Sequence, residues 1–189
     1  MGDRLLNKKI AILLTDGFEQ IEMTGPRKAL EMEGAITHLI SPNPQSVQGW
    51  HHAKMGDAFD VDRFLLKADT SEYEALLIPG GVMNSDSLRT DPNAIEFVKS
   101  FARTGKPIAA ICHAPWILIE AGVAKGHTVT SWPSLKTDLM NAGATWVDKE
   151  VVMDSGLVTS RKPDDIPAFN AKMIEEFVEG VHIQQHFAA

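Results

Sequence analysis

The 189-residue chain carries 18 lysine and arginine residues against 25 aspartate and glutamate residues, which gives a net charge of −7. This acidic balance argues against direct binding to nucleic acid or to an anionic membrane surface. A single cysteine excludes an internal disulfide and any zinc site with several cysteines. The length suits one domain with a substantial core, so we predict a single domain over residues 1–189.

The first residues, Met1 to Lys8, lack the apolar run of a signal peptide. Further along the chain, no stretch approaches the roughly 20 apolar residues of a membrane span. Both features predict a cytoplasmic protein that does not enter a membrane.

Short apolar runs alternate with helical patterns along most of the chain. The predicted strands are residues 10–14, 36–40, 75–78, 108–111, 129–132, 146–147, 151–153 and 157–160. The predicted helices cover residues 24–33, 92–104, 115–121 and 135–142, with caps at Asp91 and Ser134, and a last helix capped by Asp164 or Asp165. Residues 45–60 are hard to assign, with a short hairpin as one option. The alternation predicts an α/β fold, a three-layer α/β/α sandwich around a mostly parallel sheet.

Cys112 lies at the corner between the apolar strand 108–111 and a helix that begins near Pro115. Proline is well tolerated in the first turn of a helix, and a side chain at such a corner is held out at the carboxyl edge of the sheet. A helix N-terminus favours the thiolate, which is the nucleophilic form of cysteine. His113 follows directly, so this corner predicts a reactive sulfur with a pKa below that of free cysteine. The alternative is an inert cysteine that serves as a small buried hydrophobe.

Two further loops end at the same edge of the predicted sheet, where ligands bind in folds of this class. Residues 16–19 include Glu19, whose carboxyl could contact the sulfur or remain a solvated charge at a helix start. Gly80 and Gly81 follow the strand 75–78 and could place backbone N–H groups where an oxyanion forms, although glycine pairs are common in turns. They match neither a dinucleotide fingerprint nor a P-loop, and we expect no cofactor.

The remaining histidines offer weak signals for a metal. His51 and His52 are adjacent, so their side chains project differently, and no third ligand is obvious. His182 and His186 have helical i, i+4 spacing but lack the glutamate of a zincin motif. We therefore expect these last two, and His127, at the surface, and we expect no metal site.

Taken together, the motifs resemble the ThiJ/PfpI superfamily, and within it the PfpI branch of intracellular peptidase-like and general stress proteins. The matching segments are Asp16–Glu19, Ile78–Gly81, Ala110–Pro115, Asn141–Ala144, Trp146–Asp148 and Thr159–Arg161. They follow the order and spacing of the family from about residue 8 to 180. The resemblance implies a flavodoxin-like fold similar to that of class I glutamine amidotransferases.

The resemblance also implies roles for individual residues. Cys112 would be the nucleophile, His113 its neighbouring base and Glu19 the carboxyl that contacts the sulfur. The N–H groups of Gly81 and His113 would form the oxyanion hole. Asp86 falls where the PfpI branch takes a triad carboxylate from an adjacent subunit, and it is shorter than the glutamate of the peptidase. This sharing implies a homo-oligomer, at minimum a dimer.

Two functions remain open at this point. One is a stress-response cysteine hydrolase that acts on glycated amines and thiols, as a deglycase, or on peptides. The other is a non-enzymatic redox sensor or chaperone-like protein whose Cys112 is oxidised reversibly. Both need a reactive sulfur, so turnover has to separate them.

Overall fold

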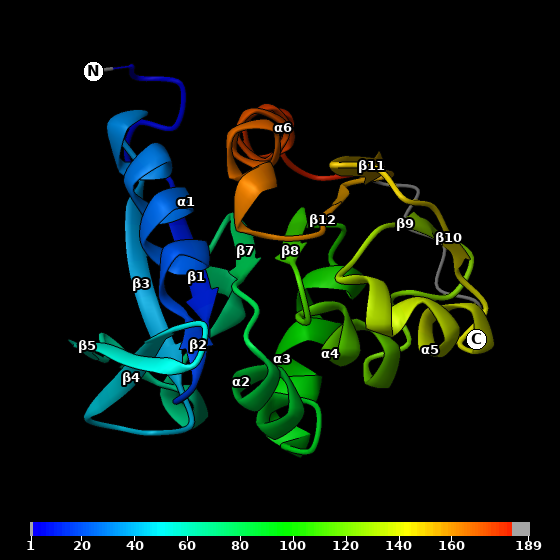
Figure 1. The fold of residues 1–189 in the computed structure, drawn as a ribbon. Coiled ribbons are helices and arrows are strands. Elements are labelled where there is room, and N and C mark those ends of the chain that lie inside the picture. The colour runs from blue at the N-terminus through cyan, green and yellow to red at the C-terminus, as the bar shows by residue number, and fades with distance from the viewer. Residues whose placement is uncertain (1, 183–189) are drawn as a thin grey trace.

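The computed structural model describes residues 2–182 and is built on a seven-stranded sheet, in the order β11-β12-β8-β7-β1-β3-β6 (Figure 1). In chain order the strands are β1 (Lys9–Leu13), β3 (Ile36–Ser41), β6 (Arg63–Phe64), β7 (Ala75–Ile78), β8 (Ile108–Ile111), β11 (Val151–Asp154) and β12 (Leu157–Ser160). Strand β11 is antiparallel to β12, and the other neighbours in the sheet are parallel. The predicted mostly parallel α/β fold is confirmed.

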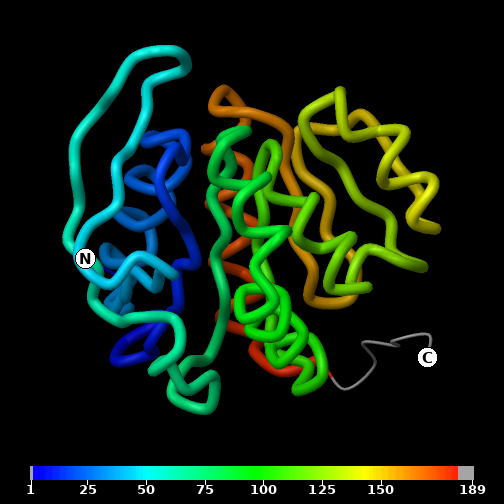
Figure 2. Tube along the Cα trace, turned by 90° about the horizontal axis from the view of Figure 1, so that it is seen from below, coloured from blue at the N-terminus to red at the C-terminus, as the bar shows by residue number. Residues whose placement is uncertain are grey.

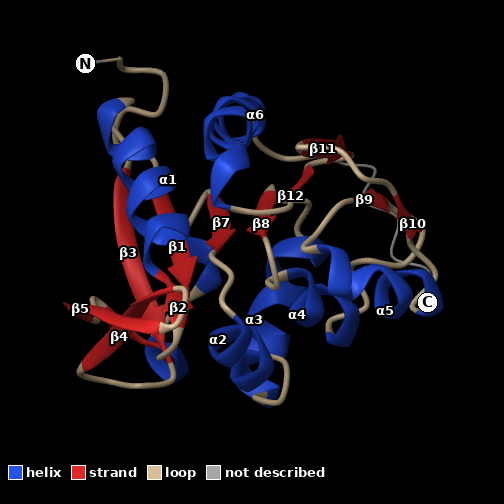
Figure 3. Ribbon diagram, viewed as in Figure 1, coloured by secondary structure: helices blue, strands red, loops and turns tan. Residues whose placement is uncertain are grey.

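Helices cover both faces of this sheet (Figure 3). They are α1 (Gln20–Met32), α2 (Val82–Leu88), α3 (Pro92–Arg103), α4 (Pro115–Glu120), α5 (Lys136–Asn141) and α6 (Ile166–Glu179). On one face, α1 and α6 pack Leu30 and Phe169 against the sheet, and on the other α3 and α4 pack Phe101 and Leu118. Full burial of each such side chain contributes about 2 kcal/mol. These two apolar layers form the predicted three-layer sandwich.

Two small sheets flank the central one. The first contains β2 (Phe18–Glu19), β4 (Ser46–His51) and β5 (Lys54–Asp60), and the second β9 (Thr128–Val129) and β10 (Thr145–Trp146). Figure 2 shows the β4–β5 hairpin and the segment around β9 and β10 on opposite sides of the molecule. A hairpin was one option for residues 45–60, and the structure contains it.

The start of the first helix differs from our prediction. Helix α1 begins at Gln20 and contains Pro26, whereas the sequence predicted a start near Thr24. Burial of Glu22 and Met23 against the neighbouring loops extends the helix beyond the proline signal. This difference matters for the site, because it places Glu22 in the first helical turn.

Other local differences also reflect tertiary contacts. Helix α2 was not among the predicted helices, and β9 ends at Val129 rather than at Trp132 because it pairs with the two-residue strand β10. Asp165 precedes α6, but its carboxylate accepts hydrogen bonds from Arg161 instead of capping the helix. Four 3-10 turns complete the described chain, at Leu65–Lys67, Thr70–Glu72, Pro133–Leu135 and Pro163–Asp165. Ser134, which was predicted to cap a helix, lies within the third of these turns instead.

Two of the expected surface histidines have different settings. His127 is buried beside Asp154, with 3.8 Å between Nδ1 and Oδ2, because the β9 segment packs against β11. The side chain of His182 is 24% exposed and contacts Glu176. His186 lies outside the described residues.

Candidate active site around Cys112

The three loops predicted at the carboxyl edge of the sheet meet there. Glu19 N–H donates to Gly80 O at 3.3 Å, so the loop after β1 contacts the loop after β7. A Cβ atom added at Gly80 would lie 2.6 Å from Cys112 Cβ, and one added at Gly81 only 2.4 Å from Gly17 O. These approaches leave no room for a side chain at either glycine.

Cys112 occupies a sharp corner between β8 and α4. Its φ of 64° lies in the left-handed region, which costs a non-glycine residue on the order of 1–2 kcal/mol. The backbone is held by two hydrogen bonds, from its N–H to Ser160 O at 3.0 Å and from Trp132 N–H to its carbonyl at 2.9 Å. The residue is 6% exposed, and its side chain lines a cavity. A strained corner that holds a side chain at a cavity is the arrangement of a nucleophile elbow.

The imidazole of His113 lies directly against the sulfur. Its Nδ1 is 3.1 Å from Cys112 Sγ. The ring lies between two indoles, with centroids 5.4 Å from Trp116 and 5.7 Å from Trp132. Burial lowers the pKa of His113 to about 4, so this imidazole is neutral at pH 7. A neutral ring can accept the thiol proton.

Glu22, which sequence analysis did not single out, provides the carboxyl beside the sulfur. It is fully buried, and its Oε2 accepts a hydrogen bond from Gly80 N–H at 2.9 Å. Burial raises the pKa of Glu22 to about 8, against a smaller opposing effect of its contact with the Cys112 thiol. The carboxyl is therefore largely protonated at neutral pH. One signal was present in the sequence: Glu22 shares a helical face with Pro26 and Leu30, both buried.

Glu19 does not take the place that the resemblance implied for it. Its Oε2 accepts a hydrogen bond from His52 N–H at 2.9 Å and lies 3.7 Å from His52 Nδ1. The expectation that Glu19 contacts the sulfur is corrected by this geometry. The reason is that β2, which ends at Glu19, pairs with β4 and directs this carboxyl to the hairpin, whereas Glu22 on α1 faces Cys112.

Two backbone N–H groups converge on the sulfur. Those of Gly81 and His113 favour the thiolate and lower the pKa of the Cys112 thiol. Burial is the largest effect, however, and together with the negative charge of an ionised Glu22 it leaves the pKa raised. Our expectation of an acidic thiol is wrong for this chain by itself, because the helix N-terminus and the N–H groups do not outweigh desolvation.

Asp86 lies on α2 and does not contact His113 within this chain. Its exposed carboxylate accepts a hydrogen bond from Arg89 Nε at 2.9 Å. The Arg89 guanidinium in turn lies 4.7 Å from the ring centre of Trp116. A role for Asp86 in the neighbouring subunit stays a prediction.

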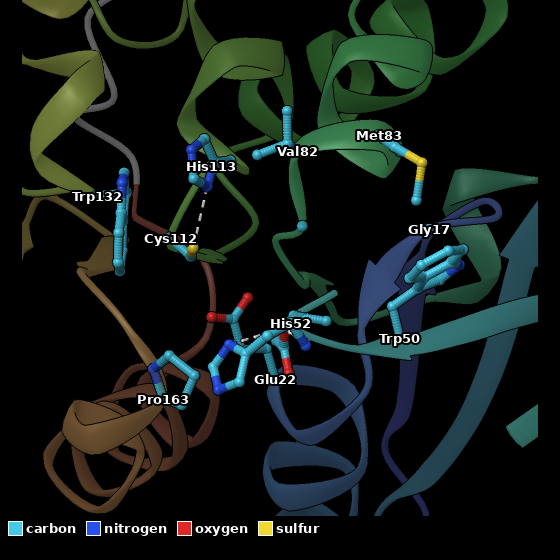
Figure 4. A pocket seen from close by; sticks show the side chains of 12 residues that line it. Gly17, Glu22, Trp50, His52, Val82, Met83, Cys112, His113, Trp132 and Pro163 are labelled. Atoms are coloured by element: carbon cyan, nitrogen blue, oxygen red, sulfur yellow. Dashed lines mark hydrogen bonds and ion pairs between the residues drawn. The ribbon is translucent and has the colours of Figure 1, made fainter. Parts of the chain in front are cut away.

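These residues surround a cavity of about 330 Å³ (Figure 4). Cys112, His113 and Glu22 form its polar end, and Glu19 and His52 lie at the hairpin side. The rest of the wall is largely apolar and consists of Gly17, Trp50, Gly81, Val82, Met83, Trp132 and Pro163. The volume suits a small molecule or one side chain of a larger substrate.

The chain is similar to known proteins in both sequence and fold. Residues 8–176 match the profile of the DJ-1/PfpI family. The chain is 42% identical to "Putative cysteine protease YraA" and 43% identical to "General stress protein 18", both of Bacillus subtilis. These alignments cover 89% of this chain and 98% and 97% of the relatives. The crystal structure of Drosophila melanogaster DJ-1beta superimposes with a TM-score of 0.82 at 28% identity, over 92% of this chain and 91% of that one.

Among the described residues, none of the helices combines the length and the apolar character that crossing a bilayer requires.

Proposed function

Because this chain belongs to the DJ-1/PfpI family, we propose that it is a hydrolase with Cys112 as its nucleophile. The observation that carries the proposal is the setting of the sulfur, which lines a cavity 3.1 Å from His113 Nδ1, beside two backbone N–H groups that lower the pKa of its thiol. The substrates are amines or thiols glycated by a small carbonyl compound, or peptides. Each offers an electrophilic carbon to a sulfur nucleophile.

In an acyl-transfer reaction, Cys112 Sγ forms a bond with the substrate carbonyl carbon while His113 Nδ1 takes the thiol proton. The carbonyl oxygen takes the displaced electron pair, and the N–H groups of Gly81 and His113 donate to it. With a peptide substrate, collapse of this intermediate breaks the amide C–N bond, and His113 returns the proton to the leaving amine. Water then hydrolyses the thioester, which releases the acid and the free thiol.

Glu22 acts on the sulfur in its protonated form. With a pKa of about 8 it carries a proton at neutral pH, and it donates a hydrogen bond to the developing thiolate instead of repelling it. The Gly80 N–H donates to Glu22 Oε2 at 2.9 Å, which fixes the orientation of the acid. When either Glu22 or Cys112 loses its proton, the single negative charge is shared between the carboxyl and the sulfur.

A second subunit completes the site in this proposal. The lowered pKa of His113, about 4, makes it a weak base in the isolated chain. A carboxylate against the other ring nitrogen would stabilise the imidazolium and raise that pKa. We assign this role to Asp86 of the partner subunit, which requires at least a homodimer.

Release of amine from a methylglyoxal-glycated peptide tests the hydrolase. We expect turnover by the wild type, none by Cys112→Ser, and full turnover by Glu120→Gln, a control on the exposed end of α4. A folded wild-type protein that turns over neither the glycated peptide nor a panel of unmodified peptides would contradict the proposal.

The second candidate is a redox sensor, and one observation favours it. The protonated Glu22 carboxyl lies beside the only thiol of the chain, where it could donate to the oxygen of a sulfenic or sulfinic acid. Mild peroxide should then oxidise Cys112 before any methionine, as read by peptide mass spectrometry. Equal oxidation of Met83, which is 48% exposed in the same cavity, would count against this role.

A further inference from the structure

A second cluster of side chains, able to bind a metal ion, lies at the C-terminal end of α6. Glu176 and Glu179 are on the last turn of this helix, and Gly180 follows with a φ of 83°. This left-handed residue turns the chain, so that His182 comes back against the helix. One donor atom from each of Glu176, Glu179 and His182 lies within 4.8 Å of the other two.

The contact between His182 and Glu176 is unusual for an ion pair. His182 Nε2 is 3.1 Å from Glu176 Oε2, yet within residues 2–182 neither atom has a hydrogen-bond partner. The side chain of Glu176 is 1% exposed. A buried carboxylate oxygen without a hydrogen bond is costly. When two ligand atoms each lie about 2.1 Å from the same metal ion, they are also close to one another. The 3.1 Å between His182 Nε2 and Glu176 Oε2 is close to the separation expected for such a pair.

The backbone holds the histidine in place. His182 N–H donates to Gly105 O at 2.8 Å, and a Cβ atom at Gly105 would lie 2.5 Å from His182 O. Gly105, in the loop between α3 and β8, therefore permits this close approach. The carbonyl groups at the end of α6 add partial negative charge, which favours a cation here.

We propose that Glu176, Glu179 and His182 bind a divalent transition-metal cation of the Zn²⁺ type. Two carboxylates balance the charge of the ion, and an imidazole ligand selects Zn²⁺ and its neighbours over Mg²⁺ and Ca²⁺, which prefer oxygen. The role is structural: α6 has 14 residues, so about 20 Å separates the cluster from the end of the helix near the cavity. The ion would tie the chain after α6 to the helix and to the loop at Gly105.

Zn²⁺ itself is the probe, in competition with a chromophoric chelator. Because Cys112 and His113 could also bind zinc, the full chain with Cys112→Ser is the parent. We expect one Zn²⁺ per chain, resistant to millimolar Ca²⁺, and a rise in the temperature of unfolding when Zn²⁺ is added. Removal of a ligand in His182→Gln or Glu179→Gln should weaken Zn²⁺ by more than about 100-fold, since loss of an outer-shell partner alone costs 10–100-fold.

Glu175→Gln is the matched control. Glu175 lies on the same turn but pairs with Lys172, so its loss should leave Zn²⁺ affinity unchanged. Glu176→Gln is not used in the test, because Glu176 is buried and its replacement could unfold the chain. Glu179 and His182 are more exposed, so their variants should remain folded. Equal affinity in the parent and His182→Gln, no binding by the Cys112→Ser parent, or displacement by Ca²⁺ would each overturn the proposal and leave a glutamate–histidine ion pair.

Discussion

Replacement of the buried Glu22 by glutamine should change how stability depends on pH. Glutamine has nearly the same shape, its carbonyl oxygen can accept from Gly80 N–H, and its amide can donate to the Cys112 sulfur. The variant therefore keeps the contacts of the protonated acid and loses its titration.

The size of the effect follows from the pKa of Glu22, which burial raises from 4.5 to about 8 in the folded chain. Between these values the folded state holds a proton that the unfolded state has released, so stability falls as pH rises. At about 1.4 kcal/mol per pH unit, the interval corresponds to about 5 kcal/mol once the pH is well above 8. The variant avoids this loss. Relative to wild type it should be more stable by less than about 1 kcal/mol at pH 5 and by about 4 kcal/mol at pH 8.

Urea unfolding followed by tryptophan fluorescence at pH 5, 6, 7 and 8 measures this difference. Subtraction of the two proteins removes the titration of other groups such as His113, whose lowered pKa changes stability in the opposite direction below pH 6.5. Glu120→Gln, on an exposed position, controls for the loss of one negative charge. A constant difference between wild type and Glu22→Gln across the four pH values would refute the buried, protonated acid.

Three further predictions concern the same site. Iodoacetamide alkylation of Cys112 should have a midpoint above the ~8.5 of free cysteine, and Glu22→Gln should move it to lower pH because the carboxylate charge is gone; a midpoint that stays in place would argue against their coupling. Gly81→Ala should abolish turnover and should lower the unfolding temperature more than Gly122→Ala does. Gly122 has a similar φ, but no atom lies within 4 Å of a Cβ added there, so equal effects of the two variants would contradict the close approach at Gly81. Asp86→Asn should lower turnover with the fold intact, and mixing it with Cys112→Ser should restore about a quarter of wild-type activity in a dimer with shared sites; a monomer by light scattering, or no rescue after verified exchange, would reject the shared site.

The sequence by itself was sufficient for the architecture and for the position of Cys112 at the corner between β8 and α4. Buried parallel strands such as β7 and β8 are continuous apolar runs, a local signal that burial on both faces imposes. The corner at Cys112 was equally readable, because an apolar strand, a proline in the first helical turn and a helical apolar pattern follow one another within a few residues. The motifs that resemble the ThiJ/PfpI superfamily agree with the family match over residues 8–176.

The roles of the carboxyl groups depended on the tertiary structure. Glu19 and Glu22 are three residues apart, and their positions are decided by where α1 begins and by the pairing of β2 with the distant strand β4. Neither feature has a local signal, since Pro26 points to a later helix start. The protonation of the site was likewise inaccessible: a helix N-terminus predicts an acidic thiol, but burial and a neighbouring carboxyl from another segment raise its pKa. Desolvation depends on every segment that excludes water, and so only the folded chain determines it.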